Sequence, residues 1–375
     1  MRILWLTWKD TTHPRAGGAE LVSSELAARL VRDGHEVTLL TGGNGKQSTP
    51  HETSTAGYRV VRVGGTYTVY WHAYRYVHRQ LTDWPDLVIE EVNTVPFFSR
   101  LYLRGTPRLM VFYMLCREIW FFQLPMPFSL LGYLLEPLYL RLVNRDPAVT
   151  ISQSTRRDLA RHGFPAERVS VIVPGIRLRP VDDLAAAEKF AQPTVLSMGN
   201  IRPMKRTLHQ IEAYERARDR MPNLRLKVAG DAPGRYGRKV LAAIASSRHR
   251  DGIEYLGPIS EDQKRRLLSS CHLILVTSIK EGWGLIVTEA ASQGTPAAVY
   301  DVDGLRDSVR DGLTGLVTAS NPEALAAAIV RLLTDPPLYE QLRENAWRWS
   351  HEITFDHAFS DLSAVIRQIP GVLQA

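Results

Sequence analysis

Short apolar runs alternate along the chain with stretches in which apolar residues recur every three or four positions. Residues 2–8 form the first run, and the helical stretch 19–34 follows, with Val22, Leu26 and Leu30 spaced four apart and Gly34 as a helix stop. Further strand-length runs lie at 36–41, 58–63, 86–91 and 108–112. Apolar strands separated by helices predict a parallel sheet covered on both faces.

The same rhythm begins again after a segment rich in proline and charge, PGIRLRPVDDLAAAEKFAQP. Here the pattern predicts strands at 193–199, 224–230, 253–257, 273–278 and 296–300, with helices between them. We therefore expect an α/β protein with two doubly wound domains, 1–178 and 179–350, that face each other across a cleft. The amphipathic end of the chain, 351–375, is expected to cross back to the first domain.

Composition narrows the class of partner. Apolar residues make up 45% of the chain and charged residues 23%, which is typical of a folded protein. The net charge of +7 suits an anionic ligand or an anionic membrane surface, but the cations are scattered, so nucleic acid is not an expected partner. Cys116 and Cys271 have no metal-ligand spacing, and the first residues carry no secretory signal, which favours a cytoplasmic protein.

Residues 119–143 are unusually apolar, with no charge from Ile119 to Leu135. Pro125, Pro127 and Pro137 argue against a straight membrane-spanning helix. Two interpretations stay open: a core helix with an apolar lead-in, or a surface that touches lipid or an apolar acceptor, peripheral at the inner membrane face.

The candidate chemistry lies in loops that follow predicted strands. EGWGLIVTE places Glu281 in a loop and Glu289 about two turns into the next helix, and Gly282 and Gly284 let a ligand approach the helix N-terminus. Arg202, Lys205 and Arg206 follow the first strand of the second domain, where they would hold an anion. Gly17 and Gly18 lie between the first strand and helix of the first domain. Each loop taken alone also has a simpler interpretation. Glu281 would complement the helix dipole and Glu289 would be a solvated helix residue. The cations would form a solvated basic turn, and the glycine pair a tight turn.

Two other patterns do not match the phosphate-binding and metal-binding motifs that they resemble. GGNGKQST at 42–49 lacks the spacing of a phosphate-binding P-loop. Asp301 and Asp303 have no further carboxylate or histidine motif nearby, so we expect no metal.

Taken together, these loops make the chain resemble the retaining glycosyltransferases of family 4, which have the GT-B fold of two Rossmann-like domains. The resemblance spans nearly the whole chain. Its motifs are GGAE at 17–20, VSVIVPGI at 169–176, VLSMGNIRPMK at 195–205, YLGPISEDQ at 255–263, EGWGLIVTEAASQGTP at 281–296 and DGLTGLV at 311–317.

The resemblance implies a nucleoside-diphosphate-sugar donor and no other cofactor or metal. Lys205 would neutralise the departing diphosphate, Glu281 would contact sugar hydroxyls and Glu289 the ribose. Gly17 and Gly18 would abut the diphosphate from the first domain. The remaining donor contacts would come from Asn200, Arg202 and the helix start at Gly282, Trp283, Gly284 and Leu285.

Three positions depart from the family. Asn200 stands where an arginine is usual, and Arg206 stands where the lysine is usually followed by glycine. Tyr113 replaces a histidine near the sugar, and Arg117 and Glu118 follow it on the expected acceptor side.

We therefore expect a metal-independent, retaining transferase that moves a hexose-like sugar to a hydroxyl acceptor, such as a glycan, a lipid-linked molecule or a small molecule. A nucleotide-sugar epimerase of similar fold and a catalytically silent nucleotide-sugar-binding protein are the alternatives.

Overall fold

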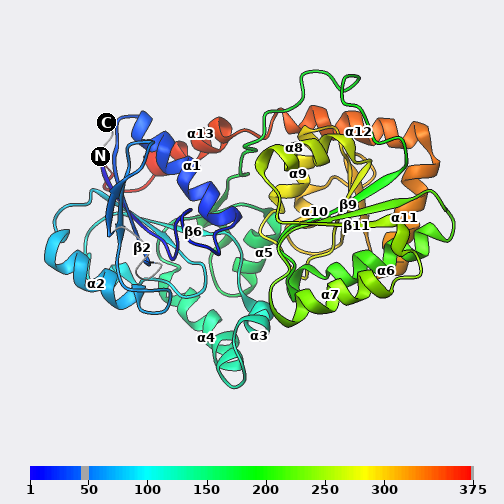
Figure 1. Ribbon diagram of the computed structural model, residues 1–375. Coiled ribbons are helices and arrows are strands. Elements are labelled where there is room, and N and C mark those ends of the chain that lie inside the picture. Colours follow the sequence, from blue (N-terminus) through cyan, green and yellow to red (C-terminus); the bar gives the residue numbers. More distant parts are fainter. Residues whose placement is uncertain (44–49, 373–375) are drawn as a thin grey trace. The chain divides into compact units, whose positions relative to one another are not determined.

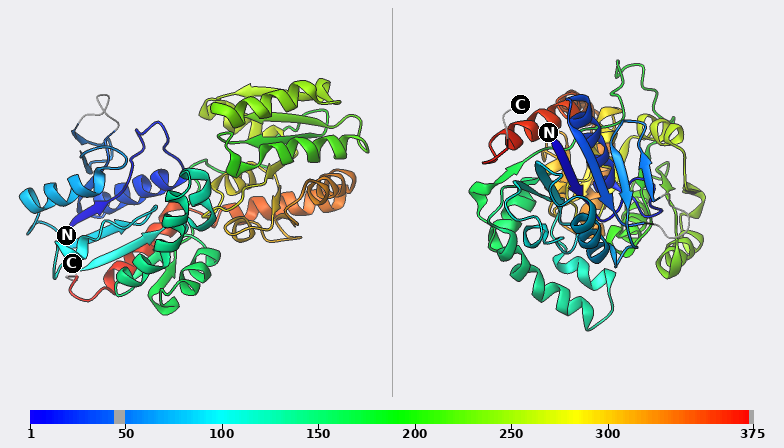
Figure 2. Two further views of the ribbon diagram at one scale, coloured as in Figure 1. Left: turned by 90° about the horizontal axis from the view of Figure 1, so that it is seen from below. Right: turned by 90° about the vertical axis from the view of Figure 1, so that its left-hand side faces the viewer.

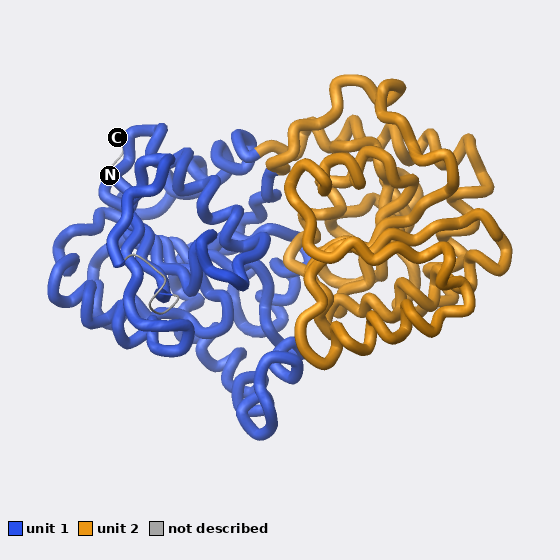
Figure 3. The backbone as a smooth tube through the Cα atoms, viewed as in Figure 1, with its two compact units in different colours: residues 1–175, 355–375 blue, residues 176–354 orange. Residues whose placement is uncertain are grey.

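The chain divides into two compact units (Figure 3), of which unit 1 comprises residues 1–175 and 355–375 and unit 2 comprises residues 176–354. The computed structural model describes residues 1–43 and 50–372, so most of the glycine-rich segment 42–49 lies outside it. Among the described residues, none of the helices combines the length and apolar character that a membrane span needs.

Unit 1 is built on a sheet in the order β3-β4-β2-β1-β5-β6-β7-β8, in which only the β3–β4 pair is antiparallel. Its strands are β1 (Arg2–Leu6), β2 (Glu36–Thr41), β3 (His51–Thr53), β4 (Arg59–Arg62), β5 (Leu87–Glu91), β6 (Arg108–Phe112), β7 (Ala148–Thr150) and β8 (Val169–Val171). Its helices are α1 (Gly18–Arg32), α2 (Val69–Gln80), α3 (Trp120–Gln123), α4 (Phe128–Val143), α5 (Gln153–Arg161) and α13 (Phe355–Arg367).

Helices cover both faces of this sheet (Figures 1 and 2). Parallel pairing places Leu4 beside Val88 and Glu90 beside Met110, so these side chains share one face. Apolar residues of α2 and α4 pack on that face. The other face carries Trp5 and Glu91 and is covered by α1, against which α13 packs. An ion pair of 2.8 Å between Arg29 and Asp356 fastens α13 to α1.

Unit 2 has a wholly parallel sheet in the order β11-β10-β9-β12-β13-β14. Its strands are β9 (Thr194–Met198), β10 (Arg225–Ala229), β11 (Ile253–Gly257), β12 (Leu273–Val276), β13 (Ala297–Tyr300) and β14 (Gly315–Thr318). Its helices are α6 (Thr207–Arg218), α7 (Gly234–Ser246), α8 (Glu261–Ser270), α9 (Leu285–Ser292), α10 (Leu305–Ser308), α11 (Pro322–Thr334) and α12 (Pro336–Ser350).

Among the parallel strands, the order of each sheet reverses at one place, between β1 and β5 in unit 1 and between β9 and β12 in unit 2. Ligands of open parallel sheets bind beyond the carboxyl ends of the strands at such a reversal. The loops after β9 and β12 therefore mark the expected site in unit 2, and both contain residues singled out from the sequence.

The proline-rich segment that opens unit 2 is tied to its body. Lys189 Nζ lies 2.8 Å from each of four oxygens, the carbonyls of Ser269, Cys271 and Gly294 and Thr295 Oγ1, which share its three N–H donors. Trp347 Nε1 also donates to the Val181 carbonyl at 2.8 Å. The segment is thus part of the unit 2 fold, although it has no helix or strand.

The predicted fold class, two doubly wound α/β halves, is confirmed. Every strand expected from apolar runs is present, with ends within two residues of those predicted. The prediction did not include β3, β7, β8 and β14, because strands of three or four residues are too short to show a periodic pattern.

Candidate functional site

The two loops at the strand-order reversal of unit 2 are joined by an ion pair between Lys205 Nζ and Glu281 Oε1. Ser278 Oγ donates to the same carboxylate oxygen at 2.5 Å. The lysine side chain is 35% exposed and the glutamate 15%, so a ligand can reach both. The Lys205 ammonium and the Glu281 carboxylate thus neutralise each other in this structure.

Buried polar side chains hold these loops together. Thr277 Oγ1 donates to the Lys205 carbonyl at 2.8 Å, and Gln210 Nε2 donates to Thr277 Oγ1 at 2.9 Å. The backbone N–H of Ile279 donates to the Met204 carbonyl at 2.8 Å. Thr277, Ser278 and Gln210 were not predicted from the sequence, although a polar Thr-Ser pair directly after an apolar strand is a signal for this role.

The start of helix α9 has no side-chain cap. Gly284 occupies the N-cap position at φ 89°, a left-handed conformation that favours glycine, and it offers no side chain to cap the helix. Gly282, Gly284 and Leu285 are half-buried. Trp283 is buried beside Trp349, with ring centroids 6.3 Å apart, so it supports the loop from the inside.

Gly304 packs directly against the backbone of the 281–282 loop. Its φ is 82°, and a Cβ atom at this position would lie 2.3 Å from the Glu281 carbonyl oxygen. The Glu281 N–H donates to the Asp303 carbonyl at 3.0 Å. The backbone of Glu281 is therefore fixed by direct contact with the 303–304 turn.

Glu289, one turn into α9, is buried and paired with Lys264 of α8 at 2.8 Å. Burial raises the pKa of Glu289, and Lys264 acts in the opposite direction. This is a partnered carboxylate and not the solvated helix residue that the sequence also allowed. Its contact with a ribose stays a prediction.

The residues of the basic loop after β9 differ in exposure and in backbone conformation. Asn200 is exposed, and Arg202 is half-buried. Arg206 has φ 49°, the left-handed region in which the family usually places a glycine, and its guanidinium lies 5.8 Å from the centre of the Tyr300 ring. The roles of Asn200 and Arg202 toward a donor stay predictions.

The carboxylates of Asp301 and Asp303 are both engaged by Arg306, at 2.7 and 2.5 Å. No cluster of three metal-ligating side chains occurs within residues 1–43 and 50–372.

In unit 1, Gly17 and Gly18 lie exposed at the N-terminus of α1. The Gly17 N–H donates to Glu20 Oε2 at 2.7 Å, and Lys9 Nζ pairs with Glu20 Oε1 at 3.1 Å. Lys9, which was not predicted from the sequence, brings a cation to this turn. The contact of Gly17 and Gly18 with a diphosphate stays a prediction.

Tyr113 belongs to a buried network in unit 1. Its hydroxyl lies 2.7 Å from Ser23 Oγ, and Ser23 also donates to Glu91. Trp5 Nε1 and Thr7 Oγ1 donate to Glu91 at 2.7 and 2.5 Å. Burial raises the pKa of Tyr113 well above its usual value, and the nearby Glu91 adds to the effect. The phenol thus fastens α1 to the sheet, and an acceptor role for it stays a prediction.

Glu91 should make the stability of the protein depend on pH. Burial raises the pKa of Glu91 from 4.5 to about 7, although its hydrogen bonds favour the charged form. Between these values the folded state binds more protons than the unfolded state, so stability falls as pH rises. In urea unfolding at pH 4.5 and pH 8, we expect the Glu91→Gln variant to gain on the order of 3 kcal/mol relative to wild type as pH rises. Glu36→Gln, an exposed control on β2, should show no such change, and parallel curves for Glu91→Gln would contradict the assignment.

Arg117 and Glu118 differ in exposure. Arg117 is buried, its N–H donates to Glu136 Oε2 at 2.7 Å, and its guanidinium lies 4.0 Å from the centre of the Tyr133 ring. Glu118 is exposed. The structure thus uses Arg117 to hold the turn before α3, and a contact of either residue with an acceptor stays a prediction.

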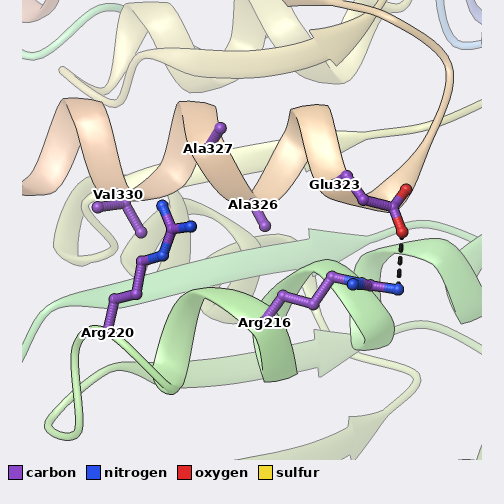
Figure 4. Close-up of a pocket in the computed structure, with 6 residues that line it drawn as sticks. All are labelled: Arg216, Arg220, Glu323, Ala326, Ala327 and Val330. Carbon is purple, nitrogen blue, oxygen red and sulfur yellow. Dashed lines mark ion pairs between the residues drawn. The ribbon is translucent and has the colours of Figure 1, made fainter.

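A small pocket of about 120 Å³ lies between α6 and α11 (Figure 4). Arg216 and Glu323 pair across it at 2.7 Å. Arg216 is nine residues beyond the start of α6, which is about 13 Å along the helix axis from the Lys205 loop. This pocket is therefore separate from the loops that carry the predicted site.

Two family models match the chain and together cover both units. Residues 16–179 match glycosyltransferase family 4, and residues 183–349 match glycosyl transferases group 1. The chain is a family 4-like glycosyltransferase. The resemblance noted from the sequence motifs is thereby confirmed.

Curated relatives of this glycosyltransferase are similar over different lengths. An uncharacterized glycosyltransferase of Methanocaldococcus jannaschii is 23% identical over 92% of both chains. D-inositol 3-phosphate glycosyltransferase of Rhodococcus jostii is 31% identical over 58% of this chain and 51% of that protein. Alpha-D-kanosaminyltransferase of Streptomyces kanamyceticus is 32% identical over 54% of this chain and 55% of that protein. The matches to the latter two relatives thus span about half of their length.

Solved structures confirm the GT-B fold of the glycosyltransferase. Sucrose-phosphate synthase from Thermosynechococcus elongatus has a TM-score of 0.79 at 20% identity, over 98% of both chains. HepE from Anabaena, in complex with UDP and glucose, has a TM-score of 0.73 at 18% identity, over 98% of this chain and 99% of that one.

Proposed function

We propose that this glycosyltransferase transfers a hexose-like sugar from a nucleoside diphosphate to a hydroxyl acceptor, with retention of configuration and without a metal ion. The observation that carries the proposal is the partly exposed Lys205–Glu281 pair, which lies at the strand-order reversal of unit 2 beside the uncapped start of α9. A cation and a carboxylate side by side match the two ends of such a donor, its diphosphate and its sugar hydroxyls.

Charge explains how the site would act. When the sugar bond breaks, negative charge develops on the diphosphate, and Lys205 together with the first N–H groups of α9 would stabilise it. Glu281 would then be free to accept hydrogen bonds from the sugar, because its partner cation has turned to the phosphates. Since protein cations meet the charge, a metal ion is not needed. We assign the acceptor proton to a phosphate oxygen on the same face of the donor, which leaves no role for a carboxylate nucleophile.

Glu289 is the proposed partner of the ribose. It lies one turn beyond Leu285, about 6 Å further along α9, and its buried pair with Lys264 orients the carboxylate. Complexes of HepE with UDP and with UDP-glucose support a nucleotide sugar as the donor class, because that protein shares the fold.

We also propose that the protein acts at a membrane surface, on a lipid-linked acceptor. The support is the segment 119–143, where α3 and α4 expose large apolar side chains, including Phe121, Phe128 and Leu142 at 47%, 60% and 66%. A soluble sugar acceptor would need no such surface.

Release of nucleoside diphosphate tests the proposed reaction. Purified protein is incubated with UDP-, GDP- and ADP-sugars, with and without a lipid extract. We expect diphosphate release from one of these donors to rise at least tenfold when the extract supplies the acceptor. Release of altered sugar without any acceptor would indicate an epimerase. Binding of a donor, seen as a higher melting temperature, without any turnover would indicate a silent binding protein.

A further inference from the structure

Two elements of unit 1 that are far apart in sequence, α2 and α4, lie on the same face of the sheet. Their apolar residues pack against strand side chains that the parallel register places on one side. Both helices also reach one residue: Tyr70 OH lies 3.3 Å from Thr94 Oγ1, and Tyr139 OH donates to the Thr94 carbonyl. Their outer surfaces are therefore parts of one face.

That face is strongly apolar on its outside. Of the fifteen large apolar side chains that are exposed among the described residues, ten lie between residues 121 and 142, on α3, α4 and the turn between them. At about 200 Å² for each fully exposed side chain, they present on the order of 1,000 Å², against about 300–600 Å² for the largest patch of a typical monomer. In Figure 1 this hairpin projects from the body of unit 1 at the lower edge of the view.

Helix α2 adds an aromatic edge to the face. Its inner positions Val69, Ala73 and Val77 are buried, whereas Trp71 is 59% exposed and Tyr74 is 36% exposed. The rings of Trp71 and Tyr74 lie 5.5 Å apart, and Tyr67, just before the helix, is 78% exposed. Tryptophan and tyrosine prefer the headgroup level of a bilayer, where the ring contacts lipid and the polar atom contacts water.

The exposed charges within α2 and the α3–α4 hairpin have one sign. Residues 67–80 contain no acidic side chain, and residues 119–143 contain only Glu136, which is buried and accepts the backbone N–H groups of Cys116 and Arg117. Arg75 and Arg79 on α2 and Arg141 on α4 are exposed. Such a face complements the negative potential of anionic lipid headgroups.

We propose that α2 and the α3–α4 hairpin form a single docking face for the surface of an anionic lipid bilayer. The hairpin supplies the leucine and phenylalanine side chains that enter the acyl boundary, and α2 supplies the aromatic and cationic contacts at the headgroups. Helix α4 has sixteen residues, about 24 Å, which is shorter than the hydrocarbon core of about 30 Å, so the contact lies along the surface. The inference extends the proposed membrane contact of 119–143 and rests on it.

Co-sedimentation with vesicles tests the docking face. Wild-type protein should bind vesicles that contain phosphatidylglycerol and should bind vesicles of phosphatidylcholine alone at least tenfold more weakly. We expect Trp71→Gln with Tyr74→Gln to weaken binding about tenfold or more, and Arg75→Gln with Arg79→Gln to weaken it by a similar factor that shrinks in high salt. Leu131→Gln with Leu134→Gln and Leu138→Gln should abolish binding.

Matched controls come from unit 2. Leu313 is 43% exposed, and Leu313→Gln should bind vesicles like wild type. Arg220→Gln with Arg331→Gln removes the same charge from exposed sites and should have little effect. Glutamine is a good helix former, so circular dichroism and melting temperature should stay unchanged in the helical variants.

Two results would overturn the inference. If the hairpin variant loses binding but both α2 variants bind like wild type, then α2 is not part of the face. If wild type does not bind vesicles and instead forms a dimer that the same variants dissociate, the face is an interface between copies. Release of nucleoside diphosphate from the donor, measured without vesicles, should be the same in all these variants. A negative result in the vesicle experiment would therefore leave the proposed transfer reaction standing.

Discussion

Replacing Lys205 by alanine is expected to lower the rate of sugar transfer about 10²- to 10³-fold while leaving the melting temperature close to that of wild type. The rate falls because the diphosphate would leave without its facing cation, and removing one preformed electrostatic contact in an active site typically costs that much. The melting temperature stays because the Lys205–Glu281 pair is partly exposed, and such pairs contribute about 0–1 kcal/mol to stability.

The measurement is the steady-state rate at saturating donor and acceptor. Lys239→Ala serves as the control, since it removes an exposed lysine from α7 of the same unit. Glu281→Gln, which keeps the size of the side chain but removes its charge, should also lower the rate by orders of magnitude. Wild-type turnover in both the Lys205 and the Glu281 variant would mean that the reaction takes place elsewhere.

Replacing Gly304 by alanine should cost unit 2 more than about 3 kcal/mol of stability and should also remove transfer activity. Alanine at φ 82° is strained, and its Cβ would meet the Glu281 carbonyl oxygen at 2.3 Å and the Glu281 carbonyl carbon at 2.6 Å. Both contacts are with backbone, so relief requires the Glu281 loop to move.

A second glycine separates the backbone strain at positive φ from the steric clash of the Cβ atom. Gly312 also has a positive φ, 68°, but a Cβ there would meet nothing within 4 Å. Gly312→Ala should therefore show only the conformational cost, about 1–2 kcal/mol, and keep its activity. In thermal unfolding this corresponds to a loss of about 6–12 °C for Gly304→Ala against about 2–8 °C for Gly312→Ala. If Gly304→Ala and Gly312→Ala lose the same melting temperature and keep the same activity, the Glu281 loop moves aside at no cost in stability, which would contradict this prediction.

The strands were the most predictable part of the fold, because buried parallel strands are continuous apolar runs. Helix α2 was not predicted, since its buried positions Val69, Ala73 and Val77 alternate with exposed aromatic residues that hide the period. For residues 119–143 the sequence allowed either a core helix or an apolar surface. The structure shows a helix that is buried at Tyr139 and Leu140 and exposed at Leu138 and Leu142.

The candidate site could be predicted in part. Each loop carries its own local signal, so Lys205 and Glu281 could be named separately. Their contact across 76 positions depends on β9 and β12 being neighbours, which no local pattern encodes. The burial of Tyr113 and Arg117 likewise depends on Ser23 and Glu136, which approach them only in the folded chain.

The last helix of the chain completes the first unit, and this bears on how the protein is synthesised. Unit 2 is in effect inserted between residue 175 and residue 355 of unit 1. As the chain leaves the ribosome, the surface of α1 that α13 covers, including Arg29, stays uncovered until unit 2 has been made. A stop at residue 354 would leave unit 2 whole and truncate unit 1, although the break lies more than 300 residues after α1 in the sequence.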